Sequence, residues 1–319
     1  MVMVESRKER LVKLCDELEK EANEALTTLS TDFNGNHLVS AKVELSEIGV
    51  SSDILREEER LKHMVYESKE NGDLDTALNL ALTMKKLNGG RNSKADKLLV
   101  DLYIEFGDFE SAKKHLSYVF DFCKYDPRAY VQYAELLYKT GEYQNAIKAI
   151  NMSFAFENNN RSPYSNSILI SSYIKLGYND LFNKKMTAIS KKYVLSELLK
   201  FYRCCVSKLT EDEILSYLPF AFEAIKYDEY AKREEKIIDE FGYQALNSYI
   251  SNLDVSSSFK ALMMLNAARL CEERKLANLS LGYIKSARSL DDGSINIKKY
   301  AVDTEKKVRF LKNSKRGVK

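Results

Sequence analysis

The chain has 319 residues, of which 45% are hydrophobic and 30% are charged, and its formal net charge is +2 at pH 7. A near-neutral balance excludes a strong global attraction to nucleic acid or to an acidic membrane, and no apolar run approaches the roughly 18 residues of a membrane span. Only three prolines and twelve glycines interrupt the sequence, which favours a mostly helical protein because helices tolerate these two residues least.

The cysteines and the N-terminus indicate a cellular location. The five cysteines are an odd number, and no two of them have C-x-x-C spacing. This usage is typical of reduced thiols in a cytoplasmic protein rather than of a disulfide framework. The opening stretch MVMVESRKERL becomes charged after four residues, so we expect no apolar signal core there.

The first segment, residues 1–52, comes before any repeat. Residues 4–30 are predicted to form one long helix, because apolar and small residues recur at alternating steps of four and three, as in a coiled-coil seam. The seam residues are Leu11, Cys15, Leu18, Ala22, Ala25 and Leu29. Two interpretations stay open: the helix packs on the first repeat of its own chain, or it forms a homodimer or partner contact. Residues 31–52 predict a loop, a short helix and a turn.

A repeat with a period near 34 residues occupies the middle of the chain. Three glycines lie 35 and 34 residues apart, and each precedes an alanine by five positions: Gly72 and Ala77, Gly107 and Ala112, Gly141 and Ala146. A fourth copy has Gly177 another 36 residues on, with Phe182 in the alanine position. A fixed period of this length indicates stacked supersecondary units.

The residue types of one unit follow from the chemistry of a helical hairpin. The glycine ends the first helix, where a positive φ is often required. An acid (Asp73, Asp108 or Glu142) then opens the second helix, where a carboxylate meets the positive helix end. Pro127 and Pro163 fall at the start of first helices, where a missing N–H costs little. The alanine is expected where the two helices cross closely.

This pattern resembles the tetratricopeptide repeat (TPR) family. Four units are delimited, at residues 58–91, 93–126, 127–160 and 163–196. A fifth candidate has Ala267, Ala268, Ile284 and Ala287 in pattern positions, but Lys275 replaces the glycine. The resemblance implies an all-α fold: a TPR-like α-solenoid over residues 53–196, wound as a right-handed superhelix of helix-turn-helix repeats.

Residues 193–250 lack the 34-residue marks, and the segment 197–305 predicts an extension of irregular helical hairpins or degenerate repeats. Thr210 and Glu213 form a capping-box pattern that opens a helix, and Pro219 is expected to kink or end it. A further helix pair is expected to break near Gly242. Residues 306–319 contain seven Lys or Arg and no acid, which predicts a frayed, solvated tail, with a nucleic-acid or acidic-lipid arm as the alternative.

No catalytic, cofactor-binding or metal-ligating pattern is recognisable. The histidines, His37, His63 and His115, are far apart in sequence, and no H-E-x-x-H, P-loop or G-x-G-x-x-G string occurs. Cys204 and Cys205 are helix neighbours whose side chains diverge by about 100° and bond poorly. A Cys–His pair assembled in space stays open. We therefore predict no enzyme, no cofactor and no metal.

The resemblance implies a concave groove, lined by the first helices of the repeats, that binds a partner protein. The candidate groove residues are Lys62, Tyr66, Lys97, Asp101, Arg128, Gln132, Tyr138 and Tyr164. Tyrosines amid mixed charge suit peptide binding, although a plain solvated face has the same composition. TPR co-chaperones that grip a C-terminal carboxylate use two Asn where this chain has Tyr66 and Leu98, so that kind of binding is not expected.

Together these features favour a cytoplasmic, non-catalytic adaptor or scaffold that binds a peptide or helix of another protein. The alternative is an accessory or regulatory subunit of a multiprotein assembly, such as a secretion or polysaccharide-synthesis machine. RNA association is a third interpretation, which the near-neutral charge disfavours because phosphate binding needs concentrated basic charge.

Overall fold

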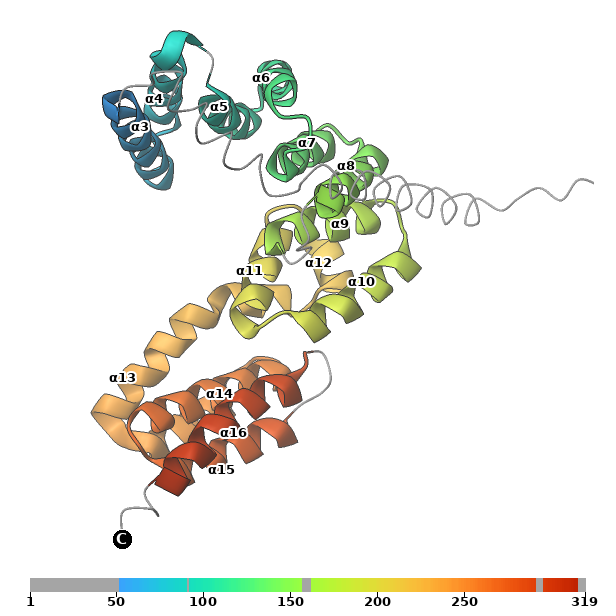
Figure 1. Ribbon diagram of the computed structural model, residues 1–319. Helices are drawn as coiled ribbons and strands as arrows, with labels where there is room; N and C mark the ends of the chain where they lie inside the picture. The colour runs from blue at the N-terminus through green and yellow to red at the C-terminus, as the bar shows by residue number, and fades with distance from the viewer. Residues whose placement is uncertain (1–51, 91, 157–161, 291–294, 315–319) are drawn as a thin grey trace, which may run out of the picture. The chain divides into compact units, whose positions relative to one another are not determined.

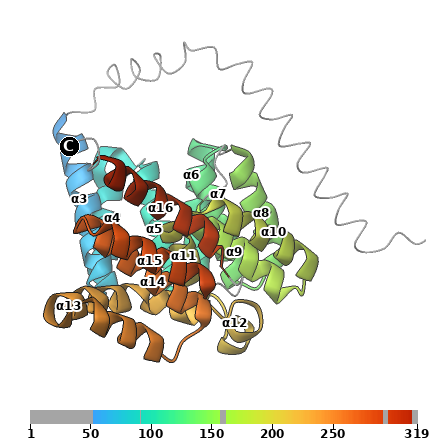
Figure 2. The same cartoon turned by 90° about the horizontal axis from the view of Figure 1, so that it is seen from below.

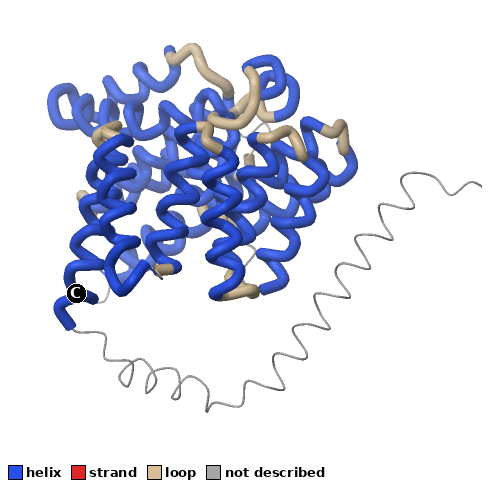
Figure 3. Tube along the Cα trace, turned by 90° about the horizontal axis from the view of Figure 1, so that it is seen from above, coloured by secondary structure: helices blue, strands red, loops and turns tan. Residues whose placement is uncertain are grey.

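The computed structural model describes residues 52–90, 92–156, 162–290 and 295–314. These residues form fourteen α-helices and one short 3-10 helix, without a strand (Figure 3), so the predicted all-α class of successive helical hairpins is confirmed. The chain divides into two compact units, Met1–Asn160 and Arg161–Lys319, and each is described by itself. The predicted N-terminal seam and His37 lie outside the described residues, and the expected segment limits at 52, 196 and 305 stay predictions.

The first unit holds three helical hairpins that follow one another in chain order (Figure 1). They are α3 (Ser52–Glu70) with α4 (Leu74–Lys86), α5 (Ser93–Phe106) with α6 (Phe109–Phe122), and α7 (Pro127–Lys139) with α8 (Tyr143–Phe156); the 3-10 helix Leu87–Gly90 follows α4. Consecutive hairpins are joined because α4 packs on α5 and α6 packs on α7, and the first helices α5 and α7 also touch directly.

The hairpins of the first unit turn at the predicted glycines. Gly141 has a φ of 82°, a region in which L side chains are strained. Its amide donates to the carbonyl of Tyr138 at 3.1 Å, and the amide of Glu142 donates to the carbonyl of Leu137 at 2.8 Å. This pair of bonds satisfies the last carbonyls of the first helix. The glycines of the other hairpins share the positive φ: Gly72, Gly107 and Gly177.

The predicted opening and crossing residues of the hairpins are confirmed. Asp73 and Asp108 cap α4 and α6, and their carboxylates accept the backbone N–H of Thr76 and Ser111 at 3.1 Å. The alanines five residues after the glycines are fully buried: Ala77, Ala112 and Ala146. A methyl group at the crossing lets two helices approach closely, and the leucine, valine and methionine side chains around it form the core.

The second unit begins with a fourth hairpin and continues into longer, less regular helices. The helices are α9 (Pro163–Lys175), α10 (Asn179–Lys192), α11 (Leu195–Val206), α12 (Glu211–Tyr217), α13 (Ala221–Asn252), α14 (Ser257–Glu273), α15 (Ala277–Ser289) and α16 (Ile297–Ser314). In the fourth hairpin Phe182 replaces the alanine, and its ring contacts Tyr217 of α12 at 5.4 Å between centroids. The last three helices lie side by side (Figures 1 and 2).

Most local predictions for the second unit are confirmed, and one needs correction. The capping box of Thr210 and Glu213 opens α12, which ends two residues before Pro219. Gly242 breaks α13 with a φ of 78°. The frayed tail expected from residue 306 is wrong as far as Ser314, because α16 continues to that residue and its Val308 is fully buried against the unit.

The pair α14–α15 is the predicted fifth hairpin. Lys275 stands at the turn with a φ of 61°, and the same two bonds close it: Lys275 N–H to Glu272 and Leu276 N–H to Cys271, both at 2.8 Å. Five residues later Ser280 occupies the alanine position, fully buried, and its hydroxyl donates to the carbonyl of Ala268 at 2.7 Å. The backbone thus keeps the repeat geometry although the marker residues have changed.

Candidate protein-binding surface

Polar side chains of α3, α5 and α7 form one connected surface in the first unit, which we call the first-helix face. Its residues are Lys62, Tyr66, Lys69, Lys97, Asp101, Glu105, Arg128 and Gln132. Lys69 of α3 pairs with Glu105 of α5 at 2.5 Å, and further bonds connect α5 to α7. Side chains from three successive hairpins therefore contact one another on the side of the first helices.

Gln132 ties α7 to α5. Its Nε2 donates to Oδ1 of Asp101 at 2.5 Å and to the backbone carbonyl of Lys97 at 2.7 Å. Both partners are acceptors, so the amide has to present its nitrogen to them. Gln132 is buried, and it fixes the spacing of the two helices from beneath the surface.

Arg128 connects all three helices. Its Nη2 lies 3.4 Å from Oδ2 of Asp101. Burial lowers the pKa of the guanidinium, but hydrogen bonds to Tyr66 and Asp101 outweigh that effect, and the pKa is raised. Arg128 of α7 and Tyr66 of α3 therefore interact above α5, which lies between their helices in chain order.

Asp101 is the acid around which the side chains of the first-helix face gather. Burial raises the pKa of its carboxyl, against the opposing effects of Gln132, Arg128 and Lys69. Its side chain nevertheless keeps 32% of its exposure to solvent. The carboxyl is thus largely surrounded by protein, while water still reaches part of it.

Lys62 and Lys97 of the first-helix face make separate ion pairs, and the last two predicted groove residues lie outside that face. Lys62 pairs with Glu59 of its own helix at 3.0 Å, and Lys97 pairs with Asp126 at the start of α7. Tyr138 is only 7% exposed, with its ring 5.2 Å from that of Tyr143, because it lies just before the turn and packs between the two helices of its hairpin. Tyr164 belongs to the second unit, where the ammonium of Lys208 lies 4.5 Å above its ring.

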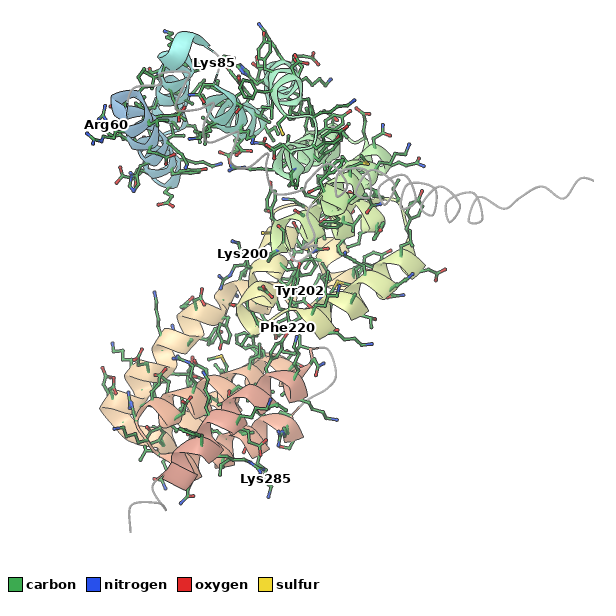
Figure 4. The ribbon with its side chains drawn as sticks, viewed as in Figure 1. Arg60, Lys85, Lys200, Tyr202, Phe220 and Lys285 are labelled. Carbon is green, nitrogen blue, oxygen red and sulfur yellow. The ribbon has the colours of Figure 1, made fainter. Side chains whose placement is uncertain are left out.

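A buried polar cluster in the first unit escaped the sequence reasoning. Lys85 of α4 (Figure 4) and His115 of α6 both contact Oδ1 of Asp96 on α5, each at 2.6 Å. A carboxylate oxygen only accepts, so Nδ1 of His115 has to carry the hydrogen. The ring of Tyr103 stacks on the imidazole at 5.4 Å, and Lys85 lies 4.4 Å above the ring of Tyr118.

The cluster acts as a tie between helices. Burial raises the pKa of Asp96, but the hydrogen bonds and charges of His115 and Lys85 outweigh it and hold the pKa below the ordinary value of 3.8. The carboxylate is thus charged and doubly bonded where α4, α5 and α6 meet. The signal in the sequence was an acid beside Ala95, within an apolar helix face where a charge needs a partner.

A second buried carboxyl, Glu234 of α13, was also missed. It is fully buried, and Asn266 of α14 donates to it at 2.7 Å. Burial raises its pKa to about 8. The signal was similar: an acid four residues before the buried Ile238, on the apolar face of an amphipathic helix.

Cysteines and histidines do not converge on a reactive centre in the described parts of the chain. Cys205 is buried, and burial raises the pKa of its thiol well above the usual range, which disfavours a nucleophilic thiolate. His63 is exposed on α3, 3.8 Å from Glu67. No group of three His, Cys, Asp or Glu with metal-binding geometry occurs among residues 52–90, 92–156, 162–290 and 295–314.

None of the helices described has both the length and the apolar character needed to cross a bilayer. No family model and no curated protein matches the chain. Among solved structures, the crystal structure of a tetratricopeptide repeat protein from Parabacteroides merdae ATCC 43184 is similar, with 13% identity over 80% of this chain and 99% of that chain. The TM-score is 0.37, so the resemblance to a family rests on the hairpins themselves.

Those hairpins agree in detail. Five of them turn at a residue with positive φ, and four of the five bury an alanine or serine five positions later. The repeated helical hairpins of this chain therefore fit a TPR-like family of helical-repeat proteins.

Proposed function

We propose that this protein is a non-catalytic adaptor that binds a peptide or helix of another protein on the first-helix face. The observation that supports it best is the convergence of Tyr66, Asp101 and Arg128 from three helices onto one surface. Side chains from successive repeats that lie together can contact one extended ligand at the same time.

The charged side chains of the first-helix face indicate what net charge the partner should have. Lys69, Lys97 and Arg128 each pair with an acid of the same chain. A strongly acidic partner would have to displace these acids, so a ligand of mixed or neutral character fits better. Tyr66 is 38% exposed, and a tyrosine offers a large contact area at low entropic cost together with a hydroxyl for backbone groups.

The N-terminal segment takes part in the proposal as a second contact. The seam Leu11, Cys15, Leu18, Ala22, Ala25 and Leu29 would pair with a partner helix or with a second copy of the chain. The exposed side chains of α3 are mostly charged, among them Arg56, Glu59, Arg60 and His63. This helix therefore offers little apolar surface on which the seam could pack within the first repeat. We place the protein in the cytoplasm on the strength of its cysteine usage.

The test is site-specific photo-cross-linking in living cells of the source organism. A benzophenone amino acid replaces Tyr66 in the full chain, and the matched control carries it at Tyr118, a tyrosine of similar exposure on α6. We expect one dominant partner, identified by mass spectrometry, to cross-link from position 66 and not from position 118. Tyr66→Ala in the otherwise natural chain should weaken capture of that partner at least fivefold without lowering the unfolding temperature.

Equal cross-linking from both positions would contradict the first-helix face as the binding surface. So would undiminished capture by Tyr66→Ala, provided that the same partner is recovered. Tyr164, in the second unit, serves as a further position whose cross-links report whether the contact continues beyond the first three hairpins.

A row of aromatic rings favours a second candidate function, that of an accessory subunit in a multiprotein assembly. Rings of α6, α7 and α8 and of the intervening turn follow one another with centroid distances of 5.1 to 6.2 Å: Tyr125, Phe156, Tyr130, Phe120 and Tyr133. Phe122, the last residue of α6, is 67% exposed. Exposed aromatic clusters of this kind are typical of permanent contacts. Phe122→Ser should release the protein from such an assembly, whereas Tyr66→Ala should not.

A further inference from the structure

A fully buried acid lies between α13 and α14 in the second unit. Glu234 lies on the first arm of α13, before the break at Gly242, and its side chain has no exposure to solvent. Nδ2 of Asn266 donates to its Oε2 at 2.7 Å. Its other oxygen, Oε1, has no hydrogen-bond partner among the described residues. A carboxyl placed in this way has one bond where an ionised carboxylate would need several.

Other titratable groups act on Glu234 through their charge. They include Tyr227 and Tyr249 on the two arms of α13 and Tyr283 on α15. Among the described residues, Arg269 of α14 is the cation that lowers the pKa of its carboxyl. On the side of α11, Arg203 is bonded to Asp228 at 2.6 Å, near the start of α13.

Arg269 does not touch the carboxyl directly. Its Nη2 and Nε donate to Oδ1 of Asn266 at 3.0 and 3.3 Å, and its Nη1 pairs with Glu273 at 2.5 Å. Asn266 therefore stands between the acid and the arginine, with its amide toward one and its carbonyl toward the other. The guanidinium is held at the surface by Glu273, one turn further along α14.

We propose that Glu234 is a proton-controlled switch: its neutral carboxyl holds α13 against α14, and loss of the proton to solvent loosens this packing. An ionised Glu234 would be a buried charge with a single amide donor. Such a charge either leaves the interior or draws in a counterion. Arg269 is the available counterion, and it can reach the carboxylate only by giving up Glu273 and displacing Asn266.

The direction of the pH effect follows from burial. Burial raises the pKa of Glu234 from 4.5 to about 8, although Asn266 and Arg269 act in the opposite direction. Between these two values the folded chain keeps a proton that the unfolded chain has lost. The stabilisation is complete below pH 4.5 and decreases as the pH rises, until it is gone above about pH 8. The switch is thus closed in weakly acidic surroundings and opens toward alkaline pH.

The test compares hydrogen exchange of α13 and α14 in three full-length proteins: the natural chain, Glu234→Gln and Glu235→Gln. Gln keeps the shape of the acid but never ionises, and Glu235 is the exposed neighbour on the same helix. From pH 5 to pH 8.5 the opening equilibrium of the natural chain should rise at least tenfold relative to Glu234→Gln, since one unit of pKa shift is worth a factor of ten. Glu235→Gln should behave as the natural chain does.

Parallel pH profiles of the natural chain and Glu234→Gln would overturn the proposal. If Glu234→Gln does not fold, the carboxyl is observed directly in the natural chain by 13C NMR of labelled glutamate. A neutral carboxyl at pH 6.5 that titrates above pH 7 supports the switch. A carboxylate already ionised at pH 6.5 rules it out.

Discussion

Asp96 in the first unit and Glu234 in the second are both buried carboxyls that bond to a neighbouring helix. Asp96 accepts hydrogen bonds from His115 and Lys85 at 2.6 Å, and its pKa is lowered. Glu234 has Asn266 as its donor, and its pKa is raised to about 8. Burial pushes both pKa values upward, so the difference comes from the partners.

The two carboxyls therefore stabilise their units in different charge states. In the α5–α6 region the ionised acid binds three helices through donors that carry or can carry positive charge. Between α13 and α14 the neutral acid is tolerated because its proton removes the charge. Asp96 links three helices as an ionised acid, whereas Glu234 makes its unit sensitive to pH. The hydrogen-bonding and charged partners of a buried acid, and not its residue type, decide which role it has.

The largest effect should come from removing the acid of the first unit. Asp96→Ala leaves Lys85 and His115 without their shared acceptor in a largely buried site. We expect a loss of about 3 kcal/mol in the free energy of unfolding, in the range found when one partner of a buried pair is deleted. Urea denaturation, followed by hydrogen exchange of α4, α5 and α6, measures it.

Asp121→Ala on α6 is the matched control, because this aspartate is exposed and its removal should change the stability by less than about 0.5 kcal/mol. A change below about 1 kcal/mol for Asp96→Ala would mean that the cluster is a bystander, as many ion pairs at protein surfaces are.

Opposite pH profiles are the second expectation. The pKa of Asp96 is depressed when the chain is folded, so its stabilisation is complete above its ordinary value of 3.8 and is lost as the pH falls through the lower folded value. The advantage of the natural chain over Asp96→Asn should be constant from pH 5 to pH 7 and should shrink below pH 3.8.

The stability advantage of the natural chain over Glu234→Gln should instead shrink as the pH rises from 4.5 toward 8. Thermal unfolding at several pH values separates the two profiles. A stability gap that narrows at the same end of the pH scale for both variants would contradict the assignment of charge states.

The sequence predicted the hairpins well and these polar clusters poorly, for a physical reason. Positive φ at Gly107 or Gly141, a cap at Asp108 and a small residue at Ala112 are local requirements, and each leaves a mark at a fixed spacing. The partners of Asp96 lie 11 and 19 residues away along the chain, and only the packing of α4 and α6 on α5 brings them together.

The predicted groove residues also show that the sequence does not reveal contacts that only the packing of helices creates. The repeat register correctly put Asp101, Arg128 and Gln132 on first helices, but it could not show that Asp101 serves as an acceptor for both Arg128 and Gln132. Tyr138 was selected by the same register, yet it packs inside its hairpin, since rotation of a helix by a fraction of a turn decides whether a side chain is outside or inside.

The turn at Gly107 in the first unit and the turn at Lys275 in the second should differ less in their response to substitution. Gly107 closes the hairpin of Asp96 at a φ of 78°, and a methyl group added there would meet no atom within 4 Å. The cost of Gly107→Ala is therefore the backbone strain alone, about 1 to 2 kcal/mol, reduced by the lower entropy of the unfolded alanine chain. We expect a net loss of about 1 kcal/mol, measured by urea denaturation. A neutral result would show that the turn relaxes to another conformation.

The reverse substitution, Lys275→Gly, should have the smallest effect and the opposite sign. Lys275 holds the same left-handed conformation at φ 61°, so glycine relieves strain in the folded chain while adding freedom to the unfolded one. The two contributions nearly cancel, and we expect a gain of about 0.5 kcal/mol, read from hydrogen exchange of α14 and α15. Arg274→Gly, one residue earlier and outside the left-handed region, is the control and should destabilise. A loss of stability for Lys275→Gly would mean that the contacts of the lysine side chain outweigh the backbone strain. The turn of the fifth hairpin would then be stabilised by side-chain contacts rather than by the conformational freedom of glycine.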